Sequence, residues 1–364
     1  MSLEVIYVVR HGFRSSWSVD HVTGTYTSYL RSPTGLPTDP ALTSHGVAQA
    51  DELATHLLGL DLPIDQVYSS PYYRCLQTIS PFISQRNAGQ NISLPSDGDV
   101  SSPRQSIRVD LGLSEWYGRA HFEHPTSAPL NDLRTWFADL DADHVSSPAP
   151  RRRGESITEL YDRVAACIQA IIMKCDQGGK KAVLVSTHAA VVIALGRILT
   201  ANVPEDPSVE DFRAFTCGLS IYRRQGINQG RSITATTDRP AITRCQDHRC
   251  RDTQEVMEAV EELPIPRRPS LDRLALEPQG PAGPNLDDLP QRRNLDSSNL
   301  WTCEVNSDCS FLRGGEERGW KFSGDESFVE FGGDGLPLST RESHSANAVE
   351  KDEGSCDNMG VPKL

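Results

Sequence analysis

The sequence lacks a hydrophobic run long enough to cross a bilayer, for which about 20 consecutive apolar residues would be needed. It also shows no secretory signal, because Met1 leads almost directly into the short apolar stretch at residues 5–9. We therefore expect a soluble protein of the cytoplasm, the nucleus or both, with no membrane partner.

Positive charge is also in short supply. The 364 residues include 36 Lys and Arg against 49 Asp and Glu, which gives a formal net charge of −13 at pH 7. A nucleic-acid-binding surface neutralises phosphates with clustered basic residues, so this balance argues against direct binding of nucleic acid. Any role at DNA would then be indirect.

The nine cysteines follow no familiar metal-binding or disulfide pattern. Their odd number and scattered positions are typical of free thiols in a reducing compartment. Cys245, His248 and Cys250 lie close together, with Cys303 and Cys309 further on, but these intervals match no known zinc finger or ribbon. We favour flexible surface thiols, keep zinc binding as the alternative, and expect no metal and no other cofactor.

Short apolar runs that end in polar residues are the main positive feature. Residues 5–10 are rich in β-branched side chains and lead into His11, which predicts a buried strand that brings this histidine to the C-terminal edge of a sheet. Residues 181–186 repeat the pattern and lead into His188. Open α/β sheets bind ligands at that edge, so the two histidines are expected to share one site.

Four more residues complete a candidate set. Arg10 and Arg14 flank the first histidine, Arg74 lies one turn into a predicted helix, and Glu115 sits in an apolar, glycine-bounded loop. Three guanidinium groups offer planar donor forks to a tetrahedral anion, so a metal is not needed for charge. Neutral imidazole can attack phosphorus, and a carboxylic acid can protonate the departing alkoxide. The set predicts a phosphomonoester hydrolase that forms a phosphohistidine on His11.

The chain resembles the histidine phosphatase superfamily, also called phosphoglycerate-mutase-like. The resemblance is carried by six motifs in family order, namely Arg10-His11-Gly12 and residues 42–50, 68–78, 111–118, 154–156 and 186–188. It implies that His11 is the phosphorylated nucleophile, His188 its phosphate-binding partner and Glu115 the general acid and base. It also implies that Arg10, Arg14 and Arg74 bind the phosphate.

Two departures from the family pattern bear on which of the family's activities we expect. Phe13 and Arg14 stand where the mutases carry Glu-Ser, so we do not expect glycolytic mutase activity. His188 is followed by two alanines, a form similar to fungal members that include a subunit of the RNA polymerase III transcription factor C. The alternative function is therefore a phosphatase-like scaffold in a nuclear transcription complex. Retention of the whole candidate set favours catalysis.

Strands alternate with helices, which predicts a three-layer α/β/α sandwich with a mostly parallel central sheet. We expect a phosphatase domain over residues 1–240, a disordered linker over 241–299, a small aromatic β-rich segment over 300–335 and a disordered tail over 336–364. The aromatic segment is too short for a core of its own. It should dock on the phosphatase domain or on a protein partner.

Two long, turn-rich insertions interrupt the alternation, at residues 17–40 and 121–150. Insertions of this kind commonly form lids that select substrate, and a loop without function is the alternative. Trp116 and Tyr117 are expected to exclude water and so to raise the pKa of Glu115. The motifs do not distinguish a phosphorylated small molecule from a phosphoprotein as substrate.

Overall fold

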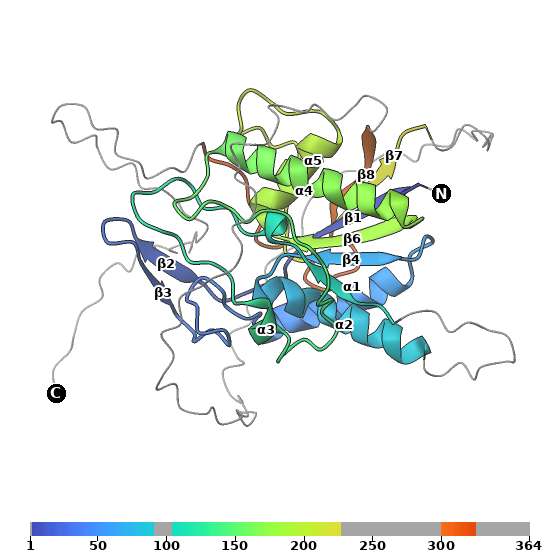
Figure 1. Ribbon diagram of the computed structural model, residues 1–364, viewed down its shortest axis with the longest axis horizontal. Helices are drawn as coiled ribbons and strands as arrows, with labels where there is room; N and C mark the ends of the chain where they lie inside the picture. The colour runs from blue at the N-terminus through green and yellow to red at the C-terminus, as the bar shows by residue number, and fades with distance from the viewer. Residues whose placement is uncertain (1, 91–103, 227–299, 325–364) are drawn as a thin grey trace, which may run out of the picture. The chain divides into compact units, whose positions relative to one another are not determined.

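The computed structural model describes residues 2–90, 104–226 and 300–324 (Figure 1). By its internal contacts the chain divides into two units, and one of them, residues 228–285, lies wholly outside the described ranges. The cysteines at 245 and 250, the expected linker, the expected tail and residues 325–335 of the expected aromatic segment also lie outside them. The elements given below all belong to the other unit.

Six strands form one central sheet in the order β5-β4-β6-β1-β7-β8, and all of them except β5 are labelled in Figure 1. They are β1 (Val5–Arg10), β4 (Gln66–Ser69), β5 (Ile107–Val109), β6 (Ala182–Thr187), β7 (Leu219–Arg224) and β8 (Trp301–Asp308). The first four are parallel to one another, and β7 and β8 join antiparallel at one edge. The mostly parallel sheet predicted from the sequence is confirmed.

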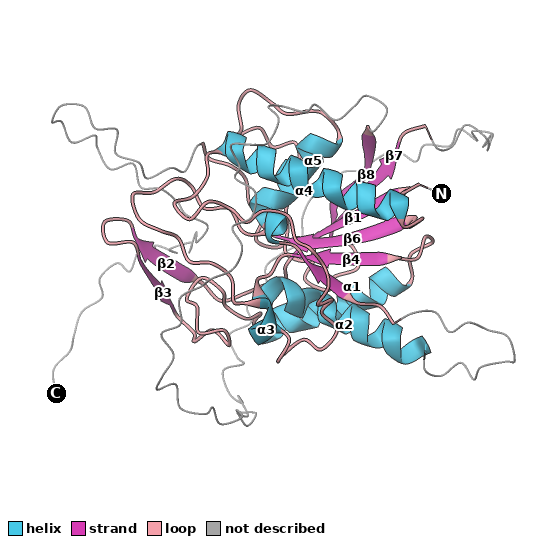
Figure 2. Cartoon of the chain, in the orientation of Figure 1, coloured by secondary structure: helices cyan, strands magenta, loops and turns pink. Residues whose placement is uncertain are grey.

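Helices cover both faces of this sheet (Figure 2). The helices α1 (Ser44–Leu58) and α2 (Tyr73–Gln90) pack on one face, and α4 (Ile157–Gln177) and α5 (Ala189–Leu199) pack on the other. Successive residues of a strand point to opposite faces, so Tyr7 joins the core under α1 and α2 while Ile6 and Val8 join the core under α4 and α5. The predicted three-layer α/β/α sandwich is therefore present.

The sequence marks where two of these helices begin. The side chain of Thr43 accepts a hydrogen bond from the backbone of Gly46 at the start of α1. Ser156 and Glu159 form a reciprocal capping box at the start of α4. Such caps satisfy amide groups that the helix itself leaves unpaired, and each contributes roughly 1 kcal/mol.

Residues 301–308, within the expected aromatic segment, belong to the main sheet. They form one eight-residue strand, β8. β8 pairs with β7 and so covers an edge that would otherwise expose unpaired backbone groups. Trp301 and Phe322 are each 1% exposed and lie in the same core as α4 and α5.

The two insertions differ in structure. Residues 17–40 contain a hairpin of β2 (Trp17–Asp20) and β3 (Thr25–Ser28) outside the main sheet. Residues 121–150 are largely irregular, with the single short helix α3 (Leu130–Leu133). No helix within the described ranges combines the length and the apolar character that a membrane crossing requires.

Candidate active site

The six residues singled out from the sequence lie close together. The rings of His11 and His188, which follow β1 and β6, are 5.5 Å apart between centroids and meet edge to face. Arg74 lies in the first turn of α2 and contacts both His188 and Glu115. Charges on Arg10 and Arg14 act on His11.

His11 is held in one tautomer. Its Nδ1 lies 2.9 Å from the carbonyl oxygen of Gly12. A carbonyl can only accept, so Nδ1 carries the proton and Nε2 keeps a free lone pair. The pKa of His11 lies well below its ordinary value, because burial and then the charges of Arg74 and Arg10 disfavour the imidazolium. The ring is therefore neutral at pH 7, as a nucleophile must be.

Gly12 is required at its position by close packing. A Cβ atom there would lie 2.9 Å from the carbonyl oxygen of Gly46 in α1. The amide of Gly12 also donates to Thr78 Oγ1 at 2.9 Å, and Thr78 in turn donates to the carbonyl of Arg74 at 2.7 Å. The residue after the first histidine is thus tied to α2, the helix that carries Arg74.

His188 has a partner that the sequence analysis missed. Its Nε2 lies 2.7 Å from Ser70 Oγ, and its Nδ1 lies 3.1 Å from Arg74 Nη2. The same Nδ1 also lies 3.2 Å from Glu115 Oε2, so it faces both a guanidinium, which donates, and a carboxylate, which accepts. Burial lowers the pKa of His188 to about 4, although Glu115 opposes the shift. Ser70 directly follows β4, so its place at a strand end could have identified it.

Arg74 is fully buried and held from several sides. Its Nη1 donates to the carbonyl of Thr38 at 2.9 Å and lies 3.5 Å from Asp39 Oδ1, and its Nη2 donates to Glu115 at 3.0 Å. Asp39, also missed from the sequence, accepts from the backbone of Tyr73 at 2.8 Å. Burial raises the pKa of Asp39 to about 6, against the pull of Arg74. The insertion at 17–40 therefore helps to fix the orientation of Arg74.

Arg10 is anchored by a segment far away in the sequence. Its Nη1 donates to the carbonyl of Ala214 at 2.6 Å and to the carbonyl of Arg318. Arg318 has a left-handed backbone with φ of 46°, and its guanidinium lies 4.0 Å above the ring of Phe13. Burial lowers the pKa of Arg10 to about 10. No sequence pattern indicated that residues after β8 would reach this site.

Three buried donors at this site have no acceptor. Arg10, Arg14 and Arg74 each keep a buried Nε–H group without a hydrogen-bond partner among the described residues. Arg14 donates its Nη1 to the carbonyl of Ser15 at 2.9 Å, and burial and Arg74 lower its pKa. An unpaired buried donor costs roughly 1–3 kcal/mol, so three of them favour an anionic ligand that supplies acceptors.

The expectation for the pKa of Glu115 was wrong. Burial alone would raise it, but His188, Arg74 and Arg14 outweigh burial and hold the pKa well below its ordinary value. Trp116 does not wall the site, because its indole donates to the carbonyl of Glu155 at 2.9 Å and its ring packs against Phe322 in the core. Adjacency in sequence could not show that neighbouring side chains point apart.

Two histidines and two arginines in and beside the insertion at residues 121–150 do not belong to this cluster. His124 is buried and hydrogen-bonded to Tyr26, whereas His121 is exposed. Arg151 and Arg152 are exposed and pair with Glu159 at 3.2 Å and Glu123 at 2.8 Å.

The ligand atoms of His11, Glu115 and His188 lie within 4.8 Å of one another, a spacing that a metal ion could bridge. The surrounding arginines oppose this. Arg10, Arg14 and Arg74 place three positive charges around the same space, and a divalent cation would be repelled by each of them. The donor set suits a phosphoryl group better than a metal.

A histidine at the end of each of two neighbouring parallel strands, surrounded by buried arginines, defines a class of phosphoryl-transfer proteins. The chain belongs to the histidine phosphatase superfamily (branch 1), whose family model matches residues 6–232.

Two curated relatives illustrate the range of this family. The chain is 29% identical over 230 residues to the transcription factor tau 55 kDa subunit of Saccharomyces cerevisiae, covering 61% of this chain and 48% of that protein. It is 28% identical over 225 residues to the ecdysteroid-phosphate phosphatase of Drosophila melanogaster, covering 55% of this chain and 27% of that protein. The chain thus spans about half or less of the length of these relatives.

Solved structures resemble the chain more weakly in sequence. The ecdysone phosphate phosphatase of Bombix mori, in complex with tungstate, aligns at 20% identity with a TM-score of 0.44, over 65% of this chain and 98% of that one. The α-ribazole phosphatase of Shigella flexneri aligns at 21% identity with a TM-score of 0.36, over 60% of this chain and 89% of that one.

Proposed function

We propose that this chain hydrolyses phosphomonoesters through a phosphohistidine on His11. The lone pair of Nε2 attacks phosphorus, the bond from phosphorus to the ester oxygen breaks, and Glu115 gives that oxygen a proton. Water then attacks the phosphohistidine and Glu115 takes its proton. The products are the alcohol, inorganic phosphate and the free imidazole.

The observation that carries this proposal is the set of unpaired guanidinium donors on Arg10, Arg14 and Arg74. Backbone carbonyls already hold the other ends of Arg10 and Arg74. Donors that are fixed in advance stabilise the charge that builds on the phosphoryl oxygens without having to reorganise during the reaction. His188, neutral and tied to Ser70, is expected to contact the same oxygens.

The low pKa of Glu115 fits an acid that becomes competent only when substrate is bound. Arg74 and Arg14 are among the charges that hold it down. A phosphoryl dianion placed among these arginines offsets their charge, so the pKa of Glu115 rises in the complex. In the free protein its protonated fraction falls with increasing pH, which favours acid-type activity.

The test is hydrolysis of phenyl phosphate across pH, in the presence of a chelator, by the native protein and by His11→Ala. We expect turnover that is independent of metal and is lost in His11→Ala, while calorimetry shows that the variant still binds inorganic phosphate. His121→Ala changes an exposed histidine and serves as the matched control. A folded native protein that binds phosphate but hydrolyses no ester would overturn the proposal.

A second candidate function follows from the similarity to a transcription-factor subunit. In this view the domain is a phosphatase-like scaffold in a nuclear complex, and the protein is nuclear. Affinity purification from nuclei separates the two candidates. A scaffold should recover partner proteins in stoichiometric amounts, whereas a free enzyme should not, and a protein that does both would show turnover and partners together.

A further inference from the structure

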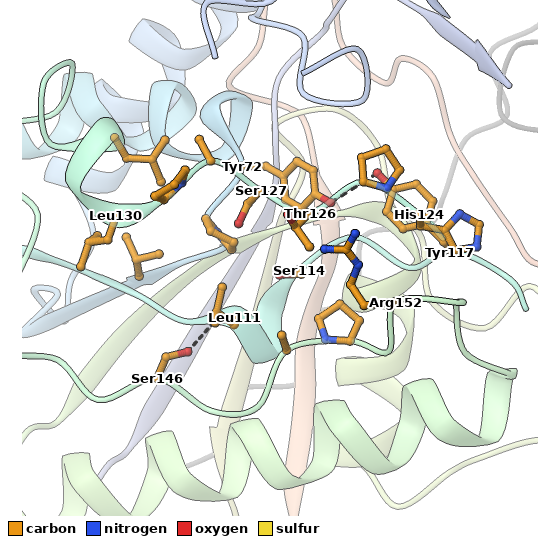
Figure 3. A pocket seen from close by; sticks show the side chains of 18 of the residues that line it. Tyr72, Leu111, Ser114, Tyr117, His124, Thr126, Ser127, Leu130, Ser146 and Arg152 are labelled. Carbon is orange, nitrogen blue, oxygen red and sulfur yellow. Dashed lines mark hydrogen bonds between the residues drawn. The ribbon is translucent and has the colours of Figure 1, made fainter. Parts of the chain in front are cut away.

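An apolar pocket of about 400 Å³ lies beside the candidate site and contains none of the six residues discussed above (Figure 3). Much of its lining is apolar, including Val109, Leu111, Ala128, Leu130 and Leu133. A cavity of this size can take a drug-sized organic molecule. Most of it is built from the insertion at residues 121–150, together with the ends of β4 and β5.

Two tyrosines form a side wall that this pocket shares with the space among the candidate phosphate-binding arginines. Tyr72 and Tyr117 both line the pocket, and their hydroxyl groups lie 3.3 Å apart (Figure 3). On its other side the ring of Tyr72 meets His188 edge to face at 5.1 Å and lies 4.6 Å from the guanidinium carbon of Arg74. The pocket therefore lies next to the candidate catalytic groups.

The hairpin of the first insertion fixes this wall. Tyr26 in β3 donates to His124 Nδ1 at 2.6 Å, and His124 Nε2 donates to the carbonyl of Gly118 at 2.8 Å. The ring of His124 also stacks on Tyr117, with centroids 4.9 Å apart and planes 13° apart. Both insertions therefore contribute to the pocket, the second through its lining and the first through the hydrogen bond of Tyr26 to His124, which favours a specificity element over a loop without function.

The position of Glu115 decides what the pocket receives. As the proposed acid, Glu115 must lie beside the leaving oxygen, so the rest of the alcohol extends away from the charged groups. The ring of Tyr72 lines the pocket and lies 4.6 Å from the guanidinium carbon of Arg74, whose Nη2 donates to Glu115 at 3.0 Å. The alcohol therefore leads toward this cavity.

The charged residues near the pocket give no reason to expect a negatively charged alcohol portion. Arg151 and Arg152 line its exposed side, but they already pair with Glu159 and Glu123. A second phosphate or a carboxylate on the alcohol would have to leave water for an apolar lining, which is costly without a partner. The lining instead favours burial of uncharged apolar surface.

We propose that the pocket binds the alcohol portion of the substrate, and that the preferred substrates are phosphomonoesters of bulky, uncharged, largely apolar alcohols. This inference rests on the proposed phosphomonoester hydrolysis. It adds a substrate class and assigns residues 121–150 as the segment that selects it.

The test compares phenyl phosphate with 2-naphthyl phosphate, whose leaving alcohols have similar acidity but different apolar area. We expect kcat/KM to be about tenfold higher for the naphthyl ester, since its second ring is buried in the pocket. Ser127→Trp fills the pocket from a half-buried position and should remove this preference. Leu130→Asp should do the same by adding a charge.

Val145→Trp is the matched control, because Val145 is 78% exposed and does not line the pocket. Fluorescence titration of 2-naphthol gives a readout that needs no catalysis, and binding should be lost in Ser127→Trp but kept in Val145→Trp. Equal kcat/KM for the two esters, with no effect of Ser127→Trp, overturns this inference and leaves the proposed hydrolysis intact. No turnover of either ester by the folded native protein overturns both.

Discussion

The candidate phosphate-binding chamber and the apolar pocket beside it share the Tyr72–Tyr117 wall but are built differently. The chamber consists of Arg10, His11, Arg14, Arg74, Glu115 and His188. The chamber stands on the ends of strands and on the first turn of a helix, with buried ion pairs and backbone carbonyls holding its arginines. The pocket stands on an irregular insertion with one short helix. Rigid elements position the groups for chemistry, while loops provide the shape that can vary between substrates.

The largest expected effect is a loss of kcat when Glu115, the proposed general acid, is replaced. Glu115→Gln keeps the shape and can still accept from Arg74, but it cannot donate a proton as a carboxylic acid does. We expect kcat for phenyl phosphate to fall by about 10²–10⁴. For 4-nitrophenyl phosphate the loss should be much smaller, because its leaving oxygen needs little protonation.

Glu159→Gln is the control for this prediction, since Glu159 belongs to the capping box of α4 and not to the chamber. It should lower the free energy of unfolding and leave kcat unchanged for both esters. An equal loss of kcat for the two esters in Glu115→Gln would show that Glu115 does not protonate the leaving group.

A somewhat smaller loss, in kcat/KM, is expected when the branched guanidinium group of Arg74 is replaced. Arg74→Lys keeps the charge but cannot bond Thr38, Glu115 and a phosphoryl oxygen together, so we expect kcat/KM to fall by about 10²–10³. Arg197→Lys is matched in burial, since Arg197 is 0% exposed and forks onto Asp211 at 2.8 Å away from the chamber. It should reduce thermal stability and leave kcat/KM of the folded protein unchanged. Similar kcat/KM values in both variants would argue against a role for Arg74 in the reaction.

The chamber could be predicted from the sequence and much of its surroundings could not. Each histidine follows a buried apolar run, and a strand end is a local feature that a pattern can encode. The hydrogen bond from Arg10 to the carbonyl of Arg318 joins residues 308 positions apart, and nothing local in either segment specifies it. The pKa of Glu115 depends on summed distances to several cations, which no motif contains.

The lining of the apolar pocket also could not be predicted from the sequence. The sequence marks the insertion at 121–150 as a candidate lid. The lining of the pocket, however, depends on which way each side chain of this loop points. Tyr117 faces the pocket, whereas Trp116, one residue earlier, packs into the core with Phe322. Without regular alternation, sequence gives no basis for assigning such neighbours to opposite sides.

A moderate effect on pH dependence is expected for Arg14→Gln. Arg14 lowers the pKa of both His11 and Glu115, so its removal raises both. His11 must be neutral and Glu115 protonated, so the acidic and basic limbs of the kcat/KM profile should both move to higher pH. Arg318→Gln is the control, because Arg318 acts on the pKa of Arg10 and is not among the main charges on His11 or Glu115. A profile that stays in place in Arg14→Gln would mean that these charges do not govern catalysis.

The smallest expected effect is on substrate preference and concerns the Tyr72–Tyr117 wall. Tyr117→Phe removes the hydroxyl that lies 3.3 Å from the hydroxyl of Tyr72 but keeps the ring stacked on His124. One neutral hydrogen bond contributes about 0.5–1.5 kcal/mol, so the preference for 2-naphthyl over phenyl phosphate should fall by about two- to tenfold, with kcat for phenyl phosphate nearly unchanged. Tyr161→Phe removes a comparable hydroxyl that accepts from Arg197 at 2.7 Å, and it should change stability without changing this preference. If Tyr117→Phe instead lowered kcat for phenyl phosphate as far as Glu115→Gln does, the Tyr117 hydroxyl would take part in the reaction itself. The Tyr72–Tyr117 wall would then belong to the catalytic chamber and not only to the pocket that selects the substrate.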